Sequence, residues 1–292
     1  MKKFGGSWTV KKLDAFINYV KAYTTILNSV KKKYNWKTIY FDGFAGCGER
    51  KIEIDTGYST LDCFPDENDY NLYQGSVARI LNLPNEYSFD FYYFIDKNKD
   101  YIAKLEQIKE TLEPSLKDKV IIRNDDCNNQ LTLMAQAIKS SKSYAALVFL
   151  DPFGMQINWE SISQLKNTRS DVWILVPSGV AINRLLDKKM KLKQIDKLER
   201  FFGLPKERIE EIFYRQGTKS SLFGEDKTIE KVQDPITKII DIYIQQLKTV
   251  WEHVTLQPLQ LTNSKNCTIF HFIFASNNRT GLKIASDILK SK

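Results

Sequence analysis

The sequence predicts an α/β fold with a mostly parallel, doubly wound sheet, and three observations predict it. Short apolar stretches alternate with amphipathic stretches of helical periodicity along most of the 292 residues. Several of the apolar stretches end in a carboxylate or a turn residue, as parallel strands do where they open into a loop. The amphipathic stretches supply the crossovers that parallel strands require. We therefore expect one domain, residues 1–292, with helices on both faces of the sheet and an antiparallel last strand.

The first part of the chain predicts a helix, a strand and an insertion. Apolar residues at helical spacing predict a long amphipathic helix over 9–33. β-Branched and aromatic residues then predict a strand over 38–42 that runs into a glycine-rich turn. Residues 51–73 lose this periodicity and predict an irregular insertion. A helix resumes at Ser76, which the sequence predicts to be its N-cap.

The middle of the chain predicts four further strands separated by helices. Each is a short run of aliphatic and aromatic residues, and each ends at polar or turn residues. The predicted strands cover 89–95, 119–123, 145–150 and 172–176. This alternation is typical of a Rossmann-like domain.

The last part predicts a helical insertion over 181–248 that contains a polar loop, 216–234. A final strand over 268–275 and a helix from Leu282 complete the predicted domain.

Four predicted strands end at or just before a carboxylate. These acids are Asp42, Asp96, Asp126 and Asp151. In a doubly wound sheet the carboxyl ends of parallel strands line one edge, so we expect the four acids to converge on one crevice. Any one of them alone is also typical of a helix N-cap or a turn.

The residues beside these acids suggest the kind of ligand. The turn Gly43, Phe44, Ala45, Gly46 is small enough for a ligand to approach the backbone closely. It lacks the dinucleotide fingerprint in its standard register, which disfavours a pyrophosphate. Asp96 is placed to accept ribose hydroxyls, and Asp126, with Cys127 and Asn128, to accept an adenine amine. S-adenosylmethionine combines adenine, ribose and a cation without phosphate, and it fits these acids.

A second group of residues follows the predicted strand 145–150. Asp151 and the carbonyl of Pro152 can accept hydrogen bonds from a base amine, and Phe153 can stack on a flat ring. The alternative is an ordinary Asp-Pro turn. If Asp151 lies at the crevice edge, its loss should change stability by less than about 1 kcal/mol.

Asn183 and Arg184 follow a strand-ending turn at the same edge, where they can contact a substrate backbone. The alternative for these two is the polar cluster of a helix N-terminus.

The charge of the chain favours a polyanionic partner. The formal net charge is +8, and lysines gather at 31–33 and again over 188–197. Nucleic acid is the expected partner, and a solvated helix face is the alternative interpretation of the lysines. His271 lies in an apolar strand, so we expect a core residue rather than a catalytic base.

The composition also predicts which classes of protein to exclude. The four cysteines are scattered and only two histidines are present, so we expect no metal site. No apolar run approaches the ~18 residues of a membrane span, and the first residues lack a signal-peptide core. We therefore expect a cytoplasmic protein with reduced cysteines and no membrane association.

Several motifs of this chain resemble a known family. The turn after the first strand, with Asp96, Asp126 and 151–154, looks like a class I S-adenosylmethionine-dependent methyltransferase. More narrowly, the chain resembles the bacterial three-Cys-motif partner proteins over almost its whole length. The residues that carry this second resemblance are Lys12-Leu13, Tyr19, 22–25, Gly75-Ser76, 150–156 and 179–186. The Asp-Pro-Phe-Gly sequence is also similar to the motif of tRNA guanine-N2 dimethyltransferases.

The resemblance implies a Rossmann-like methyltransferase that modifies an exocyclic base amine of RNA or DNA. It also implies a neighbouring partner protein with three cysteines, of the radical S-adenosylmethionine type. Two alternatives stay open: a binding subunit of that neighbour without catalysis, and a small-molecule methyltransferase. Amino-methyltransferases of adenine or cytosine usually carry two prolines before the aromatic residue, and Phe153 replaces the second. The identity of the base therefore stays open.

Overall fold

The fold is a mostly parallel sheet covered by helices on both faces. The computed structural model describes residues 7–47, 75–188, 190–221 and 224–291. The helices are α1 (Ser7–Tyr34), α2 (Ser76–Leu81), α3 (Lys99–Glu110), α4 (Pro114–Lys117), α5 (Cys127–Ser141), α6 (Trp159–Ser163), α7 (Asn183–Leu185), α8 (Ile195–Phe202), α9 (Lys206–Phe213), α10 (Pro235–Leu247) and α11 (Arg279–Lys290). Short turns of other helical types cover Asn85–Tyr87 and Ser178–Ile182. The predicted insertion over 51–73 lies outside the described residues.

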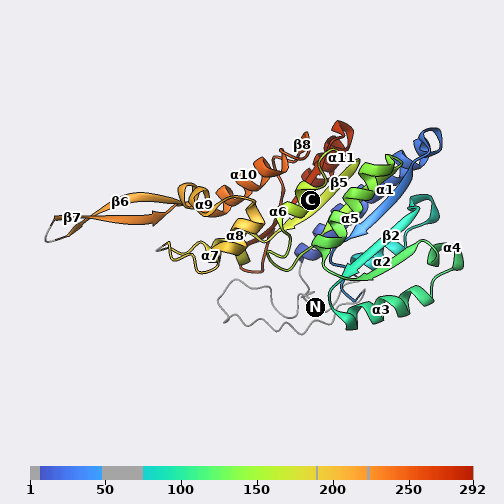
Figure 1. The fold of residues 1–292 in the computed structure, drawn as a ribbon, viewed down its shortest axis with the longest axis horizontal. Helices are drawn as coiled ribbons and strands as arrows, with labels where there is room; N and C mark the ends of the chain where they lie inside the picture. Colours follow the sequence, from blue (N-terminus) through green and yellow to red (C-terminus); the bar gives the residue numbers. More distant parts are fainter. Residues whose placement is uncertain (1–6, 48–74, 189, 222–223, 292) are drawn as a thin grey trace.

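The strand order is that of a doubly wound sheet. The strands are β1 (Lys37–Asp42), β2 (Phe91–Asp96), β3 (Val120–Asn124), β4 (Tyr144–Leu150), β5 (Ser170–Val176), β6 (Tyr214–Ser221), β7 (Gly224–Lys231), β8 (His253–Val254), β9 (Leu259–Thr262) and β10 (Thr268–Ser276). The main sheet runs in the order β3-β2-β1-β4-β5-β10-β8, and β9 pairs with β10 (Figure 1). The first five strands are parallel, and β10 is antiparallel to β5 as predicted.

The two faces of the sheet carry separate hydrophobic cores because strand residues alternate between them. In β1, Ile39 and Phe41 pack into one core, and Tyr40 packs into the other. The core around Tyr40 is closed by apolar residues of α1, α2, α3 and α11. The core around Phe41 is closed by α5, α6, α8, α9 and α10. The parallel direction of β1 to β5 then places their carboxyl ends at one edge of the sheet.

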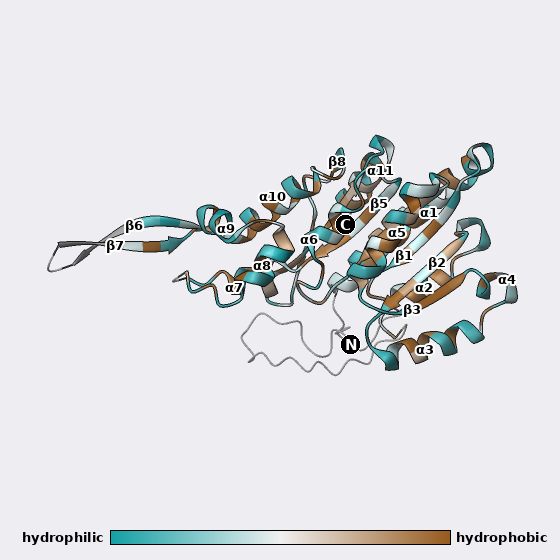
Figure 2. Ribbon diagram, in the orientation of Figure 1, coloured by the Kyte–Doolittle hydropathy of each residue, from teal (hydrophilic) through white to brown (hydrophobic). Residues whose placement is uncertain are grey.

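The segment 216–234 differs from the predicted polar loop. Strands β6 and β7 form a two-stranded antiparallel hairpin that projects from the body beyond α9 (Figure 1). In Figure 2 the strands of the main sheet carry hydrophobic stretches, whereas β6 is hydrophilic. A strand outside the main sheet needs no apolar alternation, so its sequence resembles that of a loop.

The helices of the described residues were compared with the length of a membrane span. No helix among them combines the length and the apolar character that a membrane span requires.

His271 is buried, and its Nδ1 lies 2.8 Å from the Ser178 hydroxyl. Burial lowers the pKa of His271 to about 4, which confirms the expected core residue.

Candidate functional site

The candidate site lies at the carboxyl ends of β1, β2 and β4. β1 pairs with β2 on one side and with β4 on the other, so these three strands end side by side. Asp42 and Asp96 are the last residues of β1 and β2, and Asp151 directly follows β4. Asp126 precedes α5, which follows β3. The fold therefore brings the loops that carry the four predicted acids to one edge of the sheet.

Asp42 is fully buried and supports the turn that follows it. Its carboxylate accepts hydrogen bonds from the Ser76 hydroxyl at 2.6 Å, from the Tyr40 hydroxyl at 3.2 Å and from the Phe44 amide at 3.2 Å. Burial raises the pKa of Asp42 to about 7, and the hydrogen bonds from Ser76 and Phe44 oppose this shift. Asp42 therefore stabilises the turn and the start of α2, and its carboxylate is not accessible to a ligand.

Ser76 has a different role from the one predicted. Gly75 occupies the N-cap position of α2, and no side chain caps this helix. The Ser76 hydroxyl donates to Asp42 instead.

The glycine turn is held against β2 by hydrogen bonds from its backbone amides, including that of Ala45 to the Ile95 carbonyl oxygen. Gly46 has φ of +63°, a conformation that favours glycine, and its amide donates to Asp96 at 3.0 Å. The other carboxylate oxygen of Asp96 accepts from the Asn98 amide at 2.8 Å. A Cβ added at Gly43 would lie 2.4 Å from Cys127 Sγ. Asp96 is only partly buried, and these two amides use one acceptor position on each of its oxygens, so the carboxylate can accept further hydrogen bonds.

Asp126 caps helix α5. Its carboxylate accepts from the Asn128 amide at 2.7 Å and forms an ion pair with Lys97. Burial acts to raise its pKa, but the hydrogen bonds from Lys97 and Asn128 outweigh it, and the pKa is lowered. Asp126 is therefore the N-cap of α5, which is the alternative interpretation of this residue. Its carboxylate is partly exposed.

Asn128 connects α5 with the loop after β4. Its side-chain nitrogen donates to the backbone oxygen of Gln156 at 2.9 Å, and its side-chain oxygen accepts from the Asn158 amide at 2.8 Å. Its neighbour Cys127 is buried. These contacts fix the loop that carries Asp151 and Phe153.

Asp151 forms a buried ion pair with Lys12 of α1. The Lys12 ammonium lies 2.6 Å from each carboxylate oxygen, and the two side chains are 1% and 10% exposed. The expectation that loss of Asp151 would hardly change stability assumed a carboxylate at the crevice edge, whereas the structure places it in a buried ion pair, so its removal would leave the Lys12 charge buried. The pair joins residues 139 positions apart, so helical periodicity in α1 gave no signal for it.

The residues after Asp151 form a tight loop. Pro152 is buried, and the Phe153 amide donates to the Gln156 side chain at 2.9 Å. Phe153 is nevertheless 48% exposed, like several other large apolar residues of the described chain. Part of this residue is therefore accessible to a ligand.

Asn183 is engaged within the chain. Lys231, the last residue of β7, donates to the backbone oxygen of Asn183 at 2.7 Å and to its side-chain oxygen at 2.6 Å. Burial, followed by the nearby Lys188, lowers the pKa of Lys231 to about 8. Arg184 is exposed. Asn183, one of the two predicted substrate contacts, therefore connects the last residue of β7 to the segment that follows β5.

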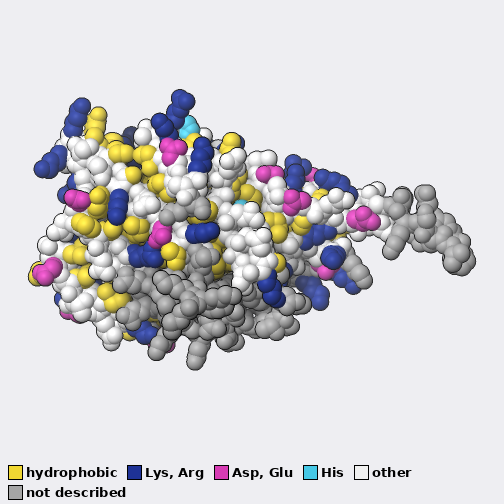
Figure 3. All heavy atoms as spheres, turned by 180° about the vertical axis from the view of Figure 1, so that it is seen from behind, with side chains coloured by type: hydrophobic (Ala, Val, Ile, Leu, Met, Phe, Trp, Pro, Cys, Tyr) yellow, Lys and Arg dark blue, Asp and Glu magenta, His cyan; other side chains and the backbone are white. Residues whose placement is uncertain are grey.

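The lysines after α7 are mostly solvated. Lys188, Lys191, Lys193 and Lys197 are exposed. In the view of Figure 3, lysine and arginine side chains are spread among acidic ones rather than gathered into one continuous stripe.

Comparisons with known proteins give little information on this chain. No family model and no curated protein matches the sequence. The solved structures similar to it include that of protein LPL1258 from Legionella pneumophila strain Philadelphia 1, described with the family model DUF519. It is 13% identical to this chain, with a TM-score of 0.36, over 90% of this chain and 96% of that one. At that TM-score the similarity supports no argument, and the function has to be inferred from the site itself.

Proposed function

We propose that this protein is an S-adenosylmethionine-dependent methyltransferase that acts on an exocyclic base amine of nucleic acid. The observation that carries the proposal is the arrangement at the carboxyl ends of β1, β2 and β4. A glycine turn, the partly exposed Asp96 and the Asp151-Pro152-Phe153 loop meet there. The resemblance to class I methyltransferases assigns the same residues to cofactor and substrate.

The residues fit the cofactor in part. Asp96 can accept further hydrogen bonds from ribose hydroxyls. Among the described residues nothing lies within 4 Å of a Cβ added at Gly46, whereas Cys127 and Leu150 fill that space at Gly43. Asp126 and Asn128 fit the adenine end less directly, because both are committed to capping α5 and holding the loop after β4. Asp42 does not fit as a direct ligand because it is fully buried. When bound, S-adenosylmethionine supplies an electrophilic methyl group.

Asp151 and Phe153 would position the acceptor base. Asp151 directly follows β4, and its carboxylate is of the kind that accepts hydrogen bonds from an amine. Lys12 compensates the carboxylate charge and fixes its orientation in a nearly dry site. Phe153 offers a half-exposed ring on which the base can stack. When the amine nitrogen accepts the methyl group and the sulfur–carbon bond of the cofactor breaks, Asp151 or water would take the proton that the nitrogen loses.

The test is transfer of a labelled methyl group from S-adenosylmethionine to total tRNA, ribosomal RNA and DNA. Asp151→Asn keeps the shape of the side chain and an oxygen for Lys12, and we expect it to lower transfer by about 10²-fold. Phe153→Ala should weaken substrate binding, whereas Leu256→Ala, at another exposed apolar position, should not. A wild-type protein that binds the cofactor but labels no nucleic acid would contradict the proposal.

The projecting hairpin favours a second candidate, the partner subunit of a three-Cys-motif protein. β6 and β7 pair only with each other among the described strands, so both outer edges are open to another chain. An isolated two-stranded hairpin is marginally stable by itself, and a partner would stabilise it. Co-purification with the neighbouring protein tests this function, with the full chain compared to a variant in which a short glycine linker replaces 214–231.

A further inference from the structure

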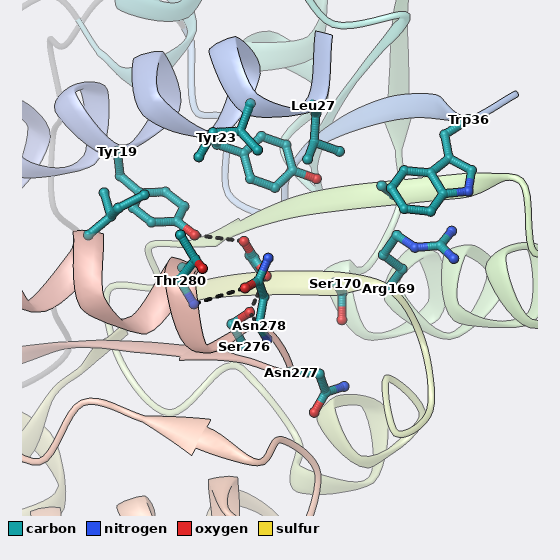
Figure 4. Close-up of a pocket in the computed structure, with 15 residues that line it drawn as sticks. Tyr19, Tyr23, Leu27, Trp36, Arg169, Ser170, Ser276, Asn277, Asn278 and Thr280 are labelled. Atoms are coloured by element: carbon teal, nitrogen blue, oxygen red, sulfur yellow. Dashed lines mark hydrogen bonds between the residues drawn. The ribbon is translucent and has the colours of Figure 1, made fainter. Parts of the chain in front are cut away.

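The structure contains a pocket at the edge of the sheet opposite to the candidate site. It has a volume of about 240 Å³ and lies between α1, α11 and the first residues of β4 and β5 (Figure 4). Ala145 and Asp171 line it near the starts of β4 and β5, whereas Asp151 follows the end of β4. The pocket is therefore separate from the loops that carry the four predicted acids.

One end of the pocket holds a partly buried acid that forms no ion pair among the described residues. Asp171 accepts hydrogen bonds from the Tyr19 hydroxyl at 2.6 Å and from the Ser276 hydroxyl at 2.5 Å. Both donors are neutral, and among the described residues no lysine, arginine or histidine forms an ion pair with Asp171. Burial raises the pKa of Asp171 to about 6, and the two hydrogen bonds oppose the shift. An added cation stabilises the ionised form of a partly buried carboxylate of this kind.

A second polar group beside this acid lacks a partner. The Tyr23 side chain is 7% exposed, and its hydroxyl has no hydrogen-bond partner among the described residues. Burial raises the pKa of Tyr23 most, the Asp171 charge raises it further, and the Arg169 charge lowers it. The hydroxyl is therefore close enough to both charges to interact with them. In Figure 4 this hydroxyl points along the pocket, past Leu27, toward the side where Trp36 lies. A buried hydroxyl without a partner is costly, and a ligand in the pocket can supply one.

The remaining walls indicate the body of the ligand. Ile26, Leu27, Ala145 and Ile284 supply apolar surface, and Trp36, whose ring is stacked on Tyr34, adds the edge of its ring. The Arg169 guanidinium lies 3.8 Å from the Trp36 ring centre and donates to the carbonyl oxygens of Lys142 and Tyr144. This fixed positive charge disfavours a ligand with a second cationic group.

We propose that this pocket binds a small monoamine with an apolar, flat body, with the ammonium group between the Asp171 carboxylate and the Tyr23 hydroxyl. The ammonium donates to both oxygens, and the apolar body lies along Leu27 toward Trp36. The tyrosine rings of the pocket add favourable contacts to a cation. The inference does not depend on the proposed methyl transfer, because no residue of that site lines the pocket.

Calorimetry on the full chain without S-adenosylmethionine tests the proposal. The probes are phenethylamine, 3-phenylpropionate as an acid of similar shape, and putrescine as a diamine. We expect saturable binding of phenethylamine, and much weaker binding of the acid and of the diamine. Equal binding of the acid and the monoamine would overturn the assignment.

Variants connect the binding to the two named groups. Asp171→Asn keeps both hydroxyl contacts possible and should weaken phenethylamine binding about tenfold, which corresponds to one charged hydrogen bond. Tyr23→Phe should weaken it several-fold without lowering the thermal midpoint, since the hydroxyl has no hydrogen bond to lose. Asp118→Asn, at an exposed acid, is the control and should change nothing. Wild-type affinity in both Asp171→Asn and Tyr23→Phe would overturn the proposal.

The pH dependence gives an independent readout. The other titratable residues that line the pocket are Tyr19 and Tyr23 of α1 and Arg169 before β5. Burial raises the pKa of both tyrosines, so Asp171 is the lining residue that changes charge near neutrality. Because the ammonium binds the ionised carboxylate, affinity should be higher at pH 7.5 than at pH 5. An affinity independent of pH in this range would contradict the assignment of Asp171 as the ammonium acceptor.

Discussion

Lys12 Nζ lies 2.6 Å from both carboxylate oxygens of Asp151, and both side chains are almost completely buried. The two residues belong to α1 and to the loop after β4, so this ion pair fixes the opening helix to the edge of the sheet that carries the candidate site. It stabilises the fold and sets the orientation of the carboxylate at once.

Removal of Lys12 should be strongly destabilising. Lys12→Met leaves the Asp151 charge buried without this cation, and we expect a loss of about 3 to 5 kcal/mol in the free energy of unfolding. Lys117→Met is the matched control, since the Lys117–Glu110 pair is far more exposed, and it should cost less than about 1 kcal/mol. Urea unfolding measures both. Equal losses in the two variants would mean that the buried pair contributes no more than a surface pair.

Asp42 should make stability fall as the pH rises. Its pKa is about 7 in the folded protein, against an ordinary value of 3.8, so the folded state holds the proton that the unfolded state releases. The contribution of this group is complete below about pH 4 and is lost as the pH rises through about 7, a change of roughly 4 kcal/mol. Asp42→Asn should remove this component. The measurement is the difference in unfolding free energy between wild type and variant from pH 4 to 8, and a constant difference would refute the assignment.

Gly43 should not tolerate a side chain. The Cβ of Gly43→Ala would lie 2.4 Å from Cys127 Sγ and 2.9 Å from Leu150 Cδ2, and overpacking of this kind costs about 1 to 3 kcal/mol. Gly154→Ala is the control, because nothing among the described residues lies within 4 Å of its added Cβ. Thermal unfolding compares them, and Gly43→Ala/Cys127→Ala should recover part of the loss. A Gly43→Ala variant as stable as Gly154→Ala would show that the turn moves aside.

The exposed lysines after α7 should contribute to binding of nucleic acid through the phosphates. Replacement of Lys188, Lys191, Lys193 and Lys197 by glutamine should weaken tRNA binding and flatten its salt dependence. For every phosphate that the variant no longer neutralises, the log-log slope should become shallower by about 0.7 to 0.9. Filter binding from low to high salt measures the slope. An unchanged slope would assign these lysines to a solvated face.

The sequence predicted the main sheet because its strands are buried on both faces, and such strands are apolar throughout. The convergence of the loops carrying Asp42, Asp96, Asp126 and Asp151 followed from the parallel order alone. The hairpin β6–β7 could not be predicted, because its strands lie outside the main sheet and carry no apolar alternation.

The sequence could not reveal which of the acids are already engaged. Lys12 and Ser76 come from α1 and α2, which reach Asp151 and Asp42 only in the folded chain. Periodicity describes the face of a helix, not its position along the sheet, so neither contact had a local signal. Asn183 is bound by Lys231, 48 positions further along the chain, and it escaped prediction for the same reason.

Helix α1 contributes Lys12 at one edge of the sheet and Tyr19 and Tyr23 at the other. From Lys12 to Tyr23 a helix rises about 16 Å, at about 1.5 Å per residue, and it transmits displacement along its axis as one body. If a ligand at either edge shifts this helix, occupancy of one site changes affinity at the other. Thermodynamic linkage then requires the same factor in both directions, so the opening helix would make the two edges of the sheet reciprocally cooperative.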